Sequence, residues 1–213
     1  MLAIYGVIGT WITIWIVSDI RRTRFLRAKL ATKNTVNQIT VALNAYHAEY
    51  GVWPVSSLNE SLQKSQWFGE MKAGASACNN ALFFTLRGIP KGPNEGYKAN
   101  SSRVIFFEGR TASFGKGFPS DGFYDRGPNG ASPSPELEAS FFDPWGHQYG
   151  IVIDTNGDGR LDLTGIYSDF TGDNAPRKQV GVFSFGKDGM VGTKGDGLYR
   201  SGAEVSDDVI SWE

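Results

Sequence analysis

The first fifty residues constrain the fold more than any other part of this 213-residue chain. Residues 2–17 carry no charged side chain, and residues 21–50 contain neither proline nor glycine. Because no helix breaker interrupts the second stretch, a helix that starts in the apolar segment can continue to Tyr50. Gly51 and Pro54 then provide a stop. The sequence therefore predicts one unusually long N-terminal helix.

The first half of this helix is interpreted as a transmembrane segment, residues 1–20. The uncharged stretch 2–17 spans about 24 Å at about 1.5 Å per residue, whereas a hydrocarbon core is about 30 Å thick, so the anchor is short. A basic cluster follows it, comprising Arg21, Arg22, Arg24, Arg27, Lys29 and Lys33. Taken alone, that cluster predicts that the C-terminal side of the helix stays in the cytoplasm.

The second half, residues 21–53, is predicted to be an amphipathic stalk. One apolar stripe recurs at steps of three and four residues, through Val36, Ile39, Leu43, Tyr46 and Tyr50. Such a stripe is typical of a helix that packs against a sheet.

Residues 141–213 supply the sheet. The motif Asp143-Pro-Trp-Gly146 predicts a turn, and the alternation of Tyr149, Ile151 and Ile153 predicts a strand with one buried face. A second strand is predicted through residues 180–185. The fold class is therefore α+β, with a long N-terminal helix on a small antiparallel sheet.

Residues 54–140 are predicted to form a variable α/β region. Residues 81–86 read as a short buried helix or strand, and residues 103–108 read as a strand. Residues 113–136, rich in Gly, Pro, Ser and Asp, read as a long surface loop.

No catalytic constellation emerges, and the chain is predicted not to be an enzyme. His47 and His147 are isolated, Cys78 is the only cysteine, and neither a phosphate-binding glycine loop nor a nucleophile elbow is present. A net charge of −1 gives no argument for nucleic acid as a partner.

Two acidic loops predict cation binding. In the first, side-chain oxygens recur as in an EF-hand loop with Gly159 at the sixth position, but position twelve is Gly165 instead of glutamate. Its donors are Asp154, Asn156, Asp158 and Asp162. This loop is either a weak Ca²⁺ site or a polar turn.

The second acidic loop closes the chain. A strand-like run leads into Asp188-Gly189, and Asp207 and Asp208 follow a glycine-rich stretch just before Trp212. This pattern can fold into one cation-binding loop, and three solvated aspartates are the alternative.

Together these features resemble type IV pilins and the pseudopilins of type II secretion. The resemblance rests on the helix ending Tyr46-x-x-x-Tyr50-Gly-x-Trp53-Pro54, on Asp143-Pro-Trp-Gly146 and on the terminal loop. In that family the mature helix opens with Phe-Thr-Leu-Ile-Glu, followed by a run similar to residues 1–9. A leader and that segment are therefore expected upstream of Met1. The segment would lengthen the short membrane anchor, and a basic leader would oppose the orientation that the cluster after the helix predicts.

The resemblance also implies a ligand set for Ca²⁺. Asp188 corresponds to the turn carboxylate, Asp207 and Asp208 to the distal carboxylates, and the main-chain carbonyls of Phe185 and Met190 complete the shell. Hard oxygen ligands in flexible geometry suit Ca²⁺.

The implied function is a structural subunit of a periplasmic filament in protein export, held in the bacterial inner membrane by a single pass. Expected partners are further copies through the N-terminal helix, minor pseudopilins, the inner-membrane assembly platform, membrane lipid and, with a leader upstream, prepilin peptidase. Two alternatives remain: a membrane-anchored calcium-binding module that does not polymerise, and an anchored hydrolase using Asp154, Asp158 or Asp188 as acid or base.

Overall fold

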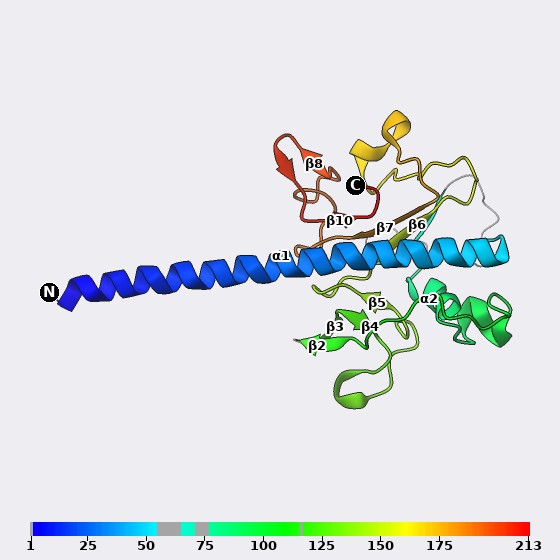
Figure 1. The fold of residues 1–213 in the computed structure, drawn as a ribbon, viewed down its shortest axis with the longest axis horizontal. Coiled ribbons are helices and arrows are strands. Elements are labelled where there is room, and N and C mark those ends of the chain that lie inside the picture. The colour runs from blue at the N-terminus through cyan, green and yellow to red at the C-terminus, as the bar shows by residue number, and fades with distance from the viewer. Residues whose placement is uncertain (1, 55–64, 71–76, 116) are drawn as a thin grey trace.

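The computed structural model describes residues 2–54, 65–70, 77–115 and 117–213, and it describes side chains from Val17 onward. One helix, α1 (Leu2–Tyr50), projects far beyond a head formed by the rest of the chain (Figure 1). It ends as predicted: Gly51 adopts φ +70°, and its N–H donates to the His47 carbonyl at 2.8 Å. Within the part of the chain whose side chains are described, no helix is both long enough and apolar enough to cross a membrane.

The predicted apolar stripe of α1 is confirmed as the surface that meets the head. Val36, Ile39 and Leu43 are fully buried, and Tyr46 is almost so. Tyr50 is partly buried and donates its hydroxyl proton to the Asn100 side chain at 2.8 Å. The helical period of 3.6 therefore places the stripe against the core along two turns and more.

The head is built on a four-stranded antiparallel sheet whose strand order is β1-β6-β7-β10. The two central strands are β6 (Gly150–Ile153) and β7 (Val180–Ser184). The edges are β1 (Gln66–Phe68) and β10 (Val209–Ile210). Helix α1 packs against β7 and β10. An α+β fold, a long N-terminal helix on a small antiparallel sheet, is thus observed.

Both faces of this sheet are buried, although the alternation in the sequence predicted one. Ile151, Ile153 and Val182 face the core shared with α1. The opposite face carries Val152 and Phe183. It is covered by residues from the following loop and the end of the chain, namely Leu161, Leu163, Ile166, Tyr167 and Trp212. A covering loop has no regular repeat of apolar residues, so the sequence pattern did not predict that this second face is buried.

Gly150 permits the close approach of β6 and β7. A Cβ atom at this position would lie 2.2 Å from the Phe183 ring. We expect Gly150→Ala to lower the free energy of unfolding by about 1–3 kcal/mol, the usual penalty for overpacking, measured by urea denaturation. Gly115→Ala is the matched control, because nothing lies within 4 Å of a Cβ there. Equal stabilities of the two variants would contradict this packing.

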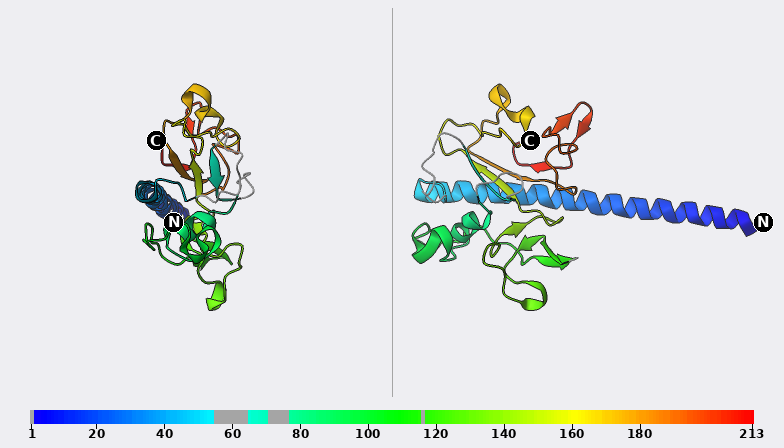
Figure 2. Two further views of the ribbon diagram at one scale, coloured as in Figure 1. Left: turned by 90° about the vertical axis from the view of Figure 1, so that its right-hand side faces the viewer. Right: turned by 180° about the vertical axis from the view of Figure 1, so that it is seen from behind.

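Residues 77–142 form a second group of elements on the other side of α1 from the C-terminal residues (Figures 1 and 2). It contains α2 (Asn80–Leu86), so the short buried segment predicted there is a helix. A cluster of aromatic rings fills its interior, with Phe83 and Phe123 5.1 Å apart between centroids. The remaining elements are η2 (Gly92–Tyr97), β2 (Ser113–Gly115), β3 (Phe118–Ser120), β4 (Gly122–Phe123), η3 (Pro128–Gly130) and β5 (Phe141–Phe142).

Two expectations for this region were wrong. Residues 103–108 form no strand, because the Asn100 amide donates to the Thr85 and Val104 carbonyls while the Phe106 N–H donates to the Leu86 carbonyl. These contacts occupy the groups that a ladder would use. Residues 113–136 are also not a plain loop, since β2 pairs with β3 and β4 pairs with β5.

Four short elements complete the C-terminal region. They are η4 (Ser168–Phe170), η5 (Gly172–Asn174), β8 (Arg200–Ser201) and β9 (Glu204–Val205). The last two pair as a small hairpin within the terminal loop.

Candidate metal site

Three carboxylates from the terminal loop converge at one edge of the sheet. Asp188, Asp207 and Asp208 each offer an oxygen, and these oxygens lie within 4.8 Å of one another. The sheet explains the convergence: β7 and β10 run antiparallel with Val209 opposite Ser184, so the end of β7 meets the start of β10. Asp188 follows β7 and the other two precede β10.

Asp208 is the most constrained of the three. Its side chain is fully buried, and its Oδ2 accepts hydrogen bonds from the Tyr167 hydroxyl at 2.7 Å and the Gly192 N–H at 2.9 Å. The other oxygen, Oδ1, is buried without a hydrogen-bond partner. Burial raises the pKa of this carboxyl from 3.8 to about 6, against the lowering effect of those donors. A cation beside Oδ1 would satisfy it.

In each of the other two carboxylates, one oxygen accepts a hydrogen bond from a backbone N–H, and this bond positions the side chain. Oδ2 of Asp207 accepts the Lys187 N–H at 2.7 Å, and Oδ1 of Asp188 accepts the Met190 N–H at 2.9 Å. Gly186 allows the approach, because a Cβ there would lie 2.7 Å from the Asp207 carboxyl carbon. The site thus offers hard oxygen donors of the kind that Ca²⁺ takes.

The two predicted main-chain ligands flank the Asp188 turn. The side chain of Phe185 is buried in the cluster on the outer face of the sheet, and that of Met190 is 43% exposed. Ligation by their carbonyl oxygens stays a prediction.

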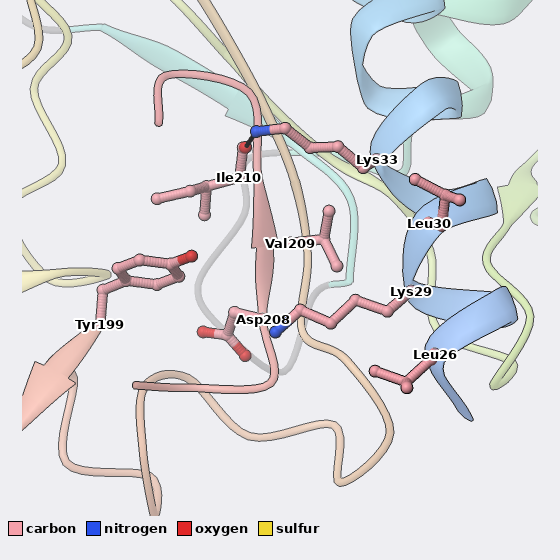
Figure 3. A pocket seen from close by; sticks show the side chains of 8 residues that line it. All are labelled: Leu26, Lys29, Leu30, Lys33, Tyr199, Asp208, Val209 and Ile210. Carbon is pink, nitrogen blue, oxygen red and sulfur yellow. Dashed lines mark hydrogen bonds between the residues drawn. The ribbon is translucent and has the colours of Figure 1, made fainter. Parts of the chain in front are cut away.

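Two lysines of α1 hold the segment that carries the distal carboxylates, one on each side of Asp207 and Asp208. The Lys29 ammonium donates to the Ser206 carbonyl at 3.2 Å. The Lys33 ammonium donates to the Ile210 carbonyl at 2.6 Å, as Figure 3 shows. Between helix and strand lies a groove of about 340 Å³, lined on the helix side by Leu26 and Leu30 and on the strand side by Val209 and Ile210. Burial lowers the pKa of Lys33 despite the opposing charge of Glu213. Sequence reasoning assigned these lysines only to a basic cluster.

Hydrogen bonds connect the Asp143 turn to the same edge of the sheet. Asp143 is fully buried, and its Oδ1 accepts three backbone N–H groups, each at 2.9 Å, from Trp145, Gly146 and His147. Its Oδ2 accepts the Ser184 hydroxyl at 2.6 Å, and that hydroxyl oxygen accepts the Gly186 N–H at 3.1 Å. Burial raises the pKa of Asp143. Ser184 therefore links the two sequence motifs physically.

His147 lies beside the metal-site loop. Its Nδ1 is 3.3 Å from Oε2 of Glu70, and this contact raises the pKa of the imidazole, with smaller contributions from Asp143 and Asp188. A Cβ at Gly189 would lie 2.3 Å from the ring, which shows how closely the turn packs on it. His47, by contrast, stacks on Trp53 at 4.1 Å between centroids.

The first acidic loop uses its carboxylates differently. Asp154 accepts the Gly157 and Gly159 N–H groups, both at 2.8 Å. Asp158 accepts the Arg160 N–H and an amide proton of Asn156, and Asp162 accepts the Thr164 N–H. These are the contacts of a polar turn. Across the described residues, the terminal triad is the single group of three such side chains close enough to hold a metal ion, so Ca²⁺ binding at 154–162 stays a prediction.

Comparison of the chain with protein-family models, with curated proteins and with solved structures finds no match.

Proposed function

We propose that this protein is a pseudopilin-like structural subunit of a filament in a type II secretion or type IV pilus-like system. The observation that carries the proposal is the joint placement of two features. A long helix lies on a small antiparallel sheet, and Asp188, Asp207 and Asp208 gather where that sheet ends. The motifs from which the family resemblance was drawn thus meet in one head.

Two exposed apolar side chains of α1, which line the groove beside β10, support assembly by helix packing. Leu26 and Leu30 are 54% and 65% exposed although both are large and apolar. Burying such side chains against a second copy removes apolar area from water, at about 25 cal/mol per Å². Exposed apolar residues along a projecting helix mark an interaction surface.

Ca²⁺ is the cation proposed for the terminal site, with Asp188, Asp207 and Asp208 as its side-chain ligands. The unpartnered Oδ1 of Asp208 and the all-oxygen donor set fit a hard cation. Extracellular Ca²⁺ sites have Kd values on the order of 10⁻⁴–10⁻³ M. At ten times Kd, binding adds about 1.4 kcal/mol to the free energy of unfolding, which orders the loop and fixes the head surface.

The proposed setting is the bacterial inner membrane, with residues 1–20 as a single-pass anchor and the head in the periplasm. The proposed partners are further copies of the chain, minor pseudopilins and the assembly platform. Prepilin peptidase joins them if a leader precedes Met1.

The decisive experiment is filament formation in the cells that express this chain. We expect Leu30→Glu to abolish filaments seen by electron microscopy, because a charge replaces an apolar contact between helices. Val52→Glu is the matched control: Val52 is also exposed, at 58%, but lies beyond the end of α1. Monomeric protein in every strain, with intact Ca²⁺ binding, would contradict assembly and favour an anchored calcium-binding module.

A further inference from the structure

We propose that four arginines on α1 form a binding surface for anionic phospholipid headgroups. This arginine ring consists of Arg21, Arg22, Arg24 and Arg27. The inference rests on the proposed membrane anchor in residues 1–20, but it concerns a different property, the lipid charge that the protein selects.

The arginine ring is exposed and available. All four side chains are exposed, and within the described residues none of them forms an ion pair. Asp19 is the one carboxylate between residues 2 and 48. Lys29 and Lys33, the next basic residues, instead hold the head through backbone carbonyls.

The angular placement of the ring favours a planar surface over a protein partner. At about 100° per residue, Arg22, Arg24 and Arg27 lie about 100°, 300° and 240° around the helix from Arg21. The ring therefore spans about 220° of the circumference. A partner helix or head would touch one side of α1, whereas a membrane surface crossed by the helix surrounds it.

The height of the ring matches a headgroup layer. From Arg21 to Arg27 the helix rises about 9 Å. A leaflet's polar region is about 5–7 Å thick, from the difference between total and hydrocarbon thickness, and the length of the arginine side chain covers the remainder. The head starts at this level, since the Phe25 ring lies 6.1 Å from that of Trp145.

Charge gives the ring a physical role. Residues 1–50 hold six of the chain's 21 basic and two of its 22 acidic side chains, so residues 51–213 carry 15 basic and 20 acidic ones. The head thus has a net charge of −5, and an anionic bilayer repels it. Arginines at the membrane side of the head reverse that repulsion locally.

The test compares binding of the full chain to vesicles of phosphatidylcholine with binding to vesicles that also contain phosphatidylglycerol, by flotation at 0.1 M salt. Each basic residue near an anionic surface is worth about fivefold in affinity. Replacing all four ring arginines by glutamine should therefore lower the preference for anionic vesicles by roughly two to three orders of magnitude. The preference of the unmutated chain should also shrink at 0.5 M salt.

The matched control replaces four exposed basic residues of the head by glutamine, and so changes the net charge equally: Lys98, Arg126, Arg177 and Lys178. This variant should keep the preference. A ring variant that keeps it, or a control that loses as much, overturns the inference. If the ring instead bound the acidic head of a second copy, the ring variant would change oligomeric state by sedimentation with an unaltered lipid preference, which also overturns it.

The same data separate this inference from the proposed function. Equal binding to both vesicle types refutes lipid selection and leaves the anchor standing. Binding to neither refutes the anchor and the inference together. Lipid selection without filaments leaves the inference intact and refutes assembly.

Discussion

Replacing Ile39 by aspartate is expected to destabilise the head by about 4 kcal/mol or more, the range reached when an unpaired charge is buried. Ile39 is fully buried in the core between α1 and the sheet, in the same cluster as Val36 and Val182. An aspartate there either loses its hydration or pushes the helix off the sheet. Urea denaturation followed by tryptophan fluorescence measures the loss.

Val41→Asp is the control for Ile39→Asp. Val41 lies on the same helix two residues away, but it is 67% exposed. The control changes charge and helix propensity in the same way, and its stability should change by less than about 0.5 kcal/mol, as for ordinary surface substitutions. A head equally stable in both variants would show that α1 is not part of its core.

The second large effect is expected at Asp208, where Asp208→Asn should stabilise the metal-free protein at pH 7. The pKa of this carboxyl is about 6 in the fold and 3.8 without it, so its ionisation opposes folding by about 3 kcal/mol. An amide oxygen can still accept from Tyr167 and Gly192, while the amide nitrogen takes the place of the unpartnered Oδ1. Placing an amide nitrogen in this buried site costs part of that energy. The free energy of unfolding, measured in chelator, should therefore rise by about 2 kcal/mol.

The same substitution should remove the response to Ca²⁺, because a ligand charge is lost. Asp173→Asn, an exposed aspartate outside the site, is the control and should alter neither quantity. A lower metal-free stability of Asp208→Asn together with a full Ca²⁺ response would contradict the ligand role.

The pH dependence follows from the sign of the Asp208 shift. A pKa raised by folding means that the folded protein binds a proton more readily than the unfolded one. The resulting stability is complete below about pH 3.8 and is lost as the pH rises through about 6. In the metal-free protein this term therefore weakens the fold between pH 4 and 6.5. Ca²⁺ bound at the proposed site would offset the loss above about pH 6, where the carboxylate is ionised.

Local patterns in the sequence predicted the helix and its buried stripe. The stop at Gly51 and the burial of Ile39 and Leu43 follow from residues within a few turns of one another. The strand predicted at 103–108 does not form, because the nearby Asn100 side chain donates to the Val104 carbonyl and the Phe106 N–H donates to the Leu86 carbonyl, twenty residues earlier. The alternation of apolar residues gives no information about hydrogen bonds that compete with strand pairing.

The candidate site was predictable in its carboxylates but not in their surroundings. The turn and the acidic pair indicated Asp188, Asp207 and Asp208. Nothing in the spacing indicated that Tyr167 would bind Asp208, or that Lys29 would reach the Ser206 carbonyl. These contacts join residues 41 and 177 positions apart, and tertiary packing alone brings them together.

The central claim is that the end of the chain closes around a hard cation. Thermal unfolding of the unmutated protein, in saturating Ca²⁺ and in chelator at pH 7.5, tests it most directly. We expect a Tm higher in Ca²⁺ by about 3–6 °C, from about 1.4 kcal/mol at ten times Kd, and a smaller difference in Asp188→Ala. Identical melting temperatures with Ca²⁺ and with chelator would contradict it.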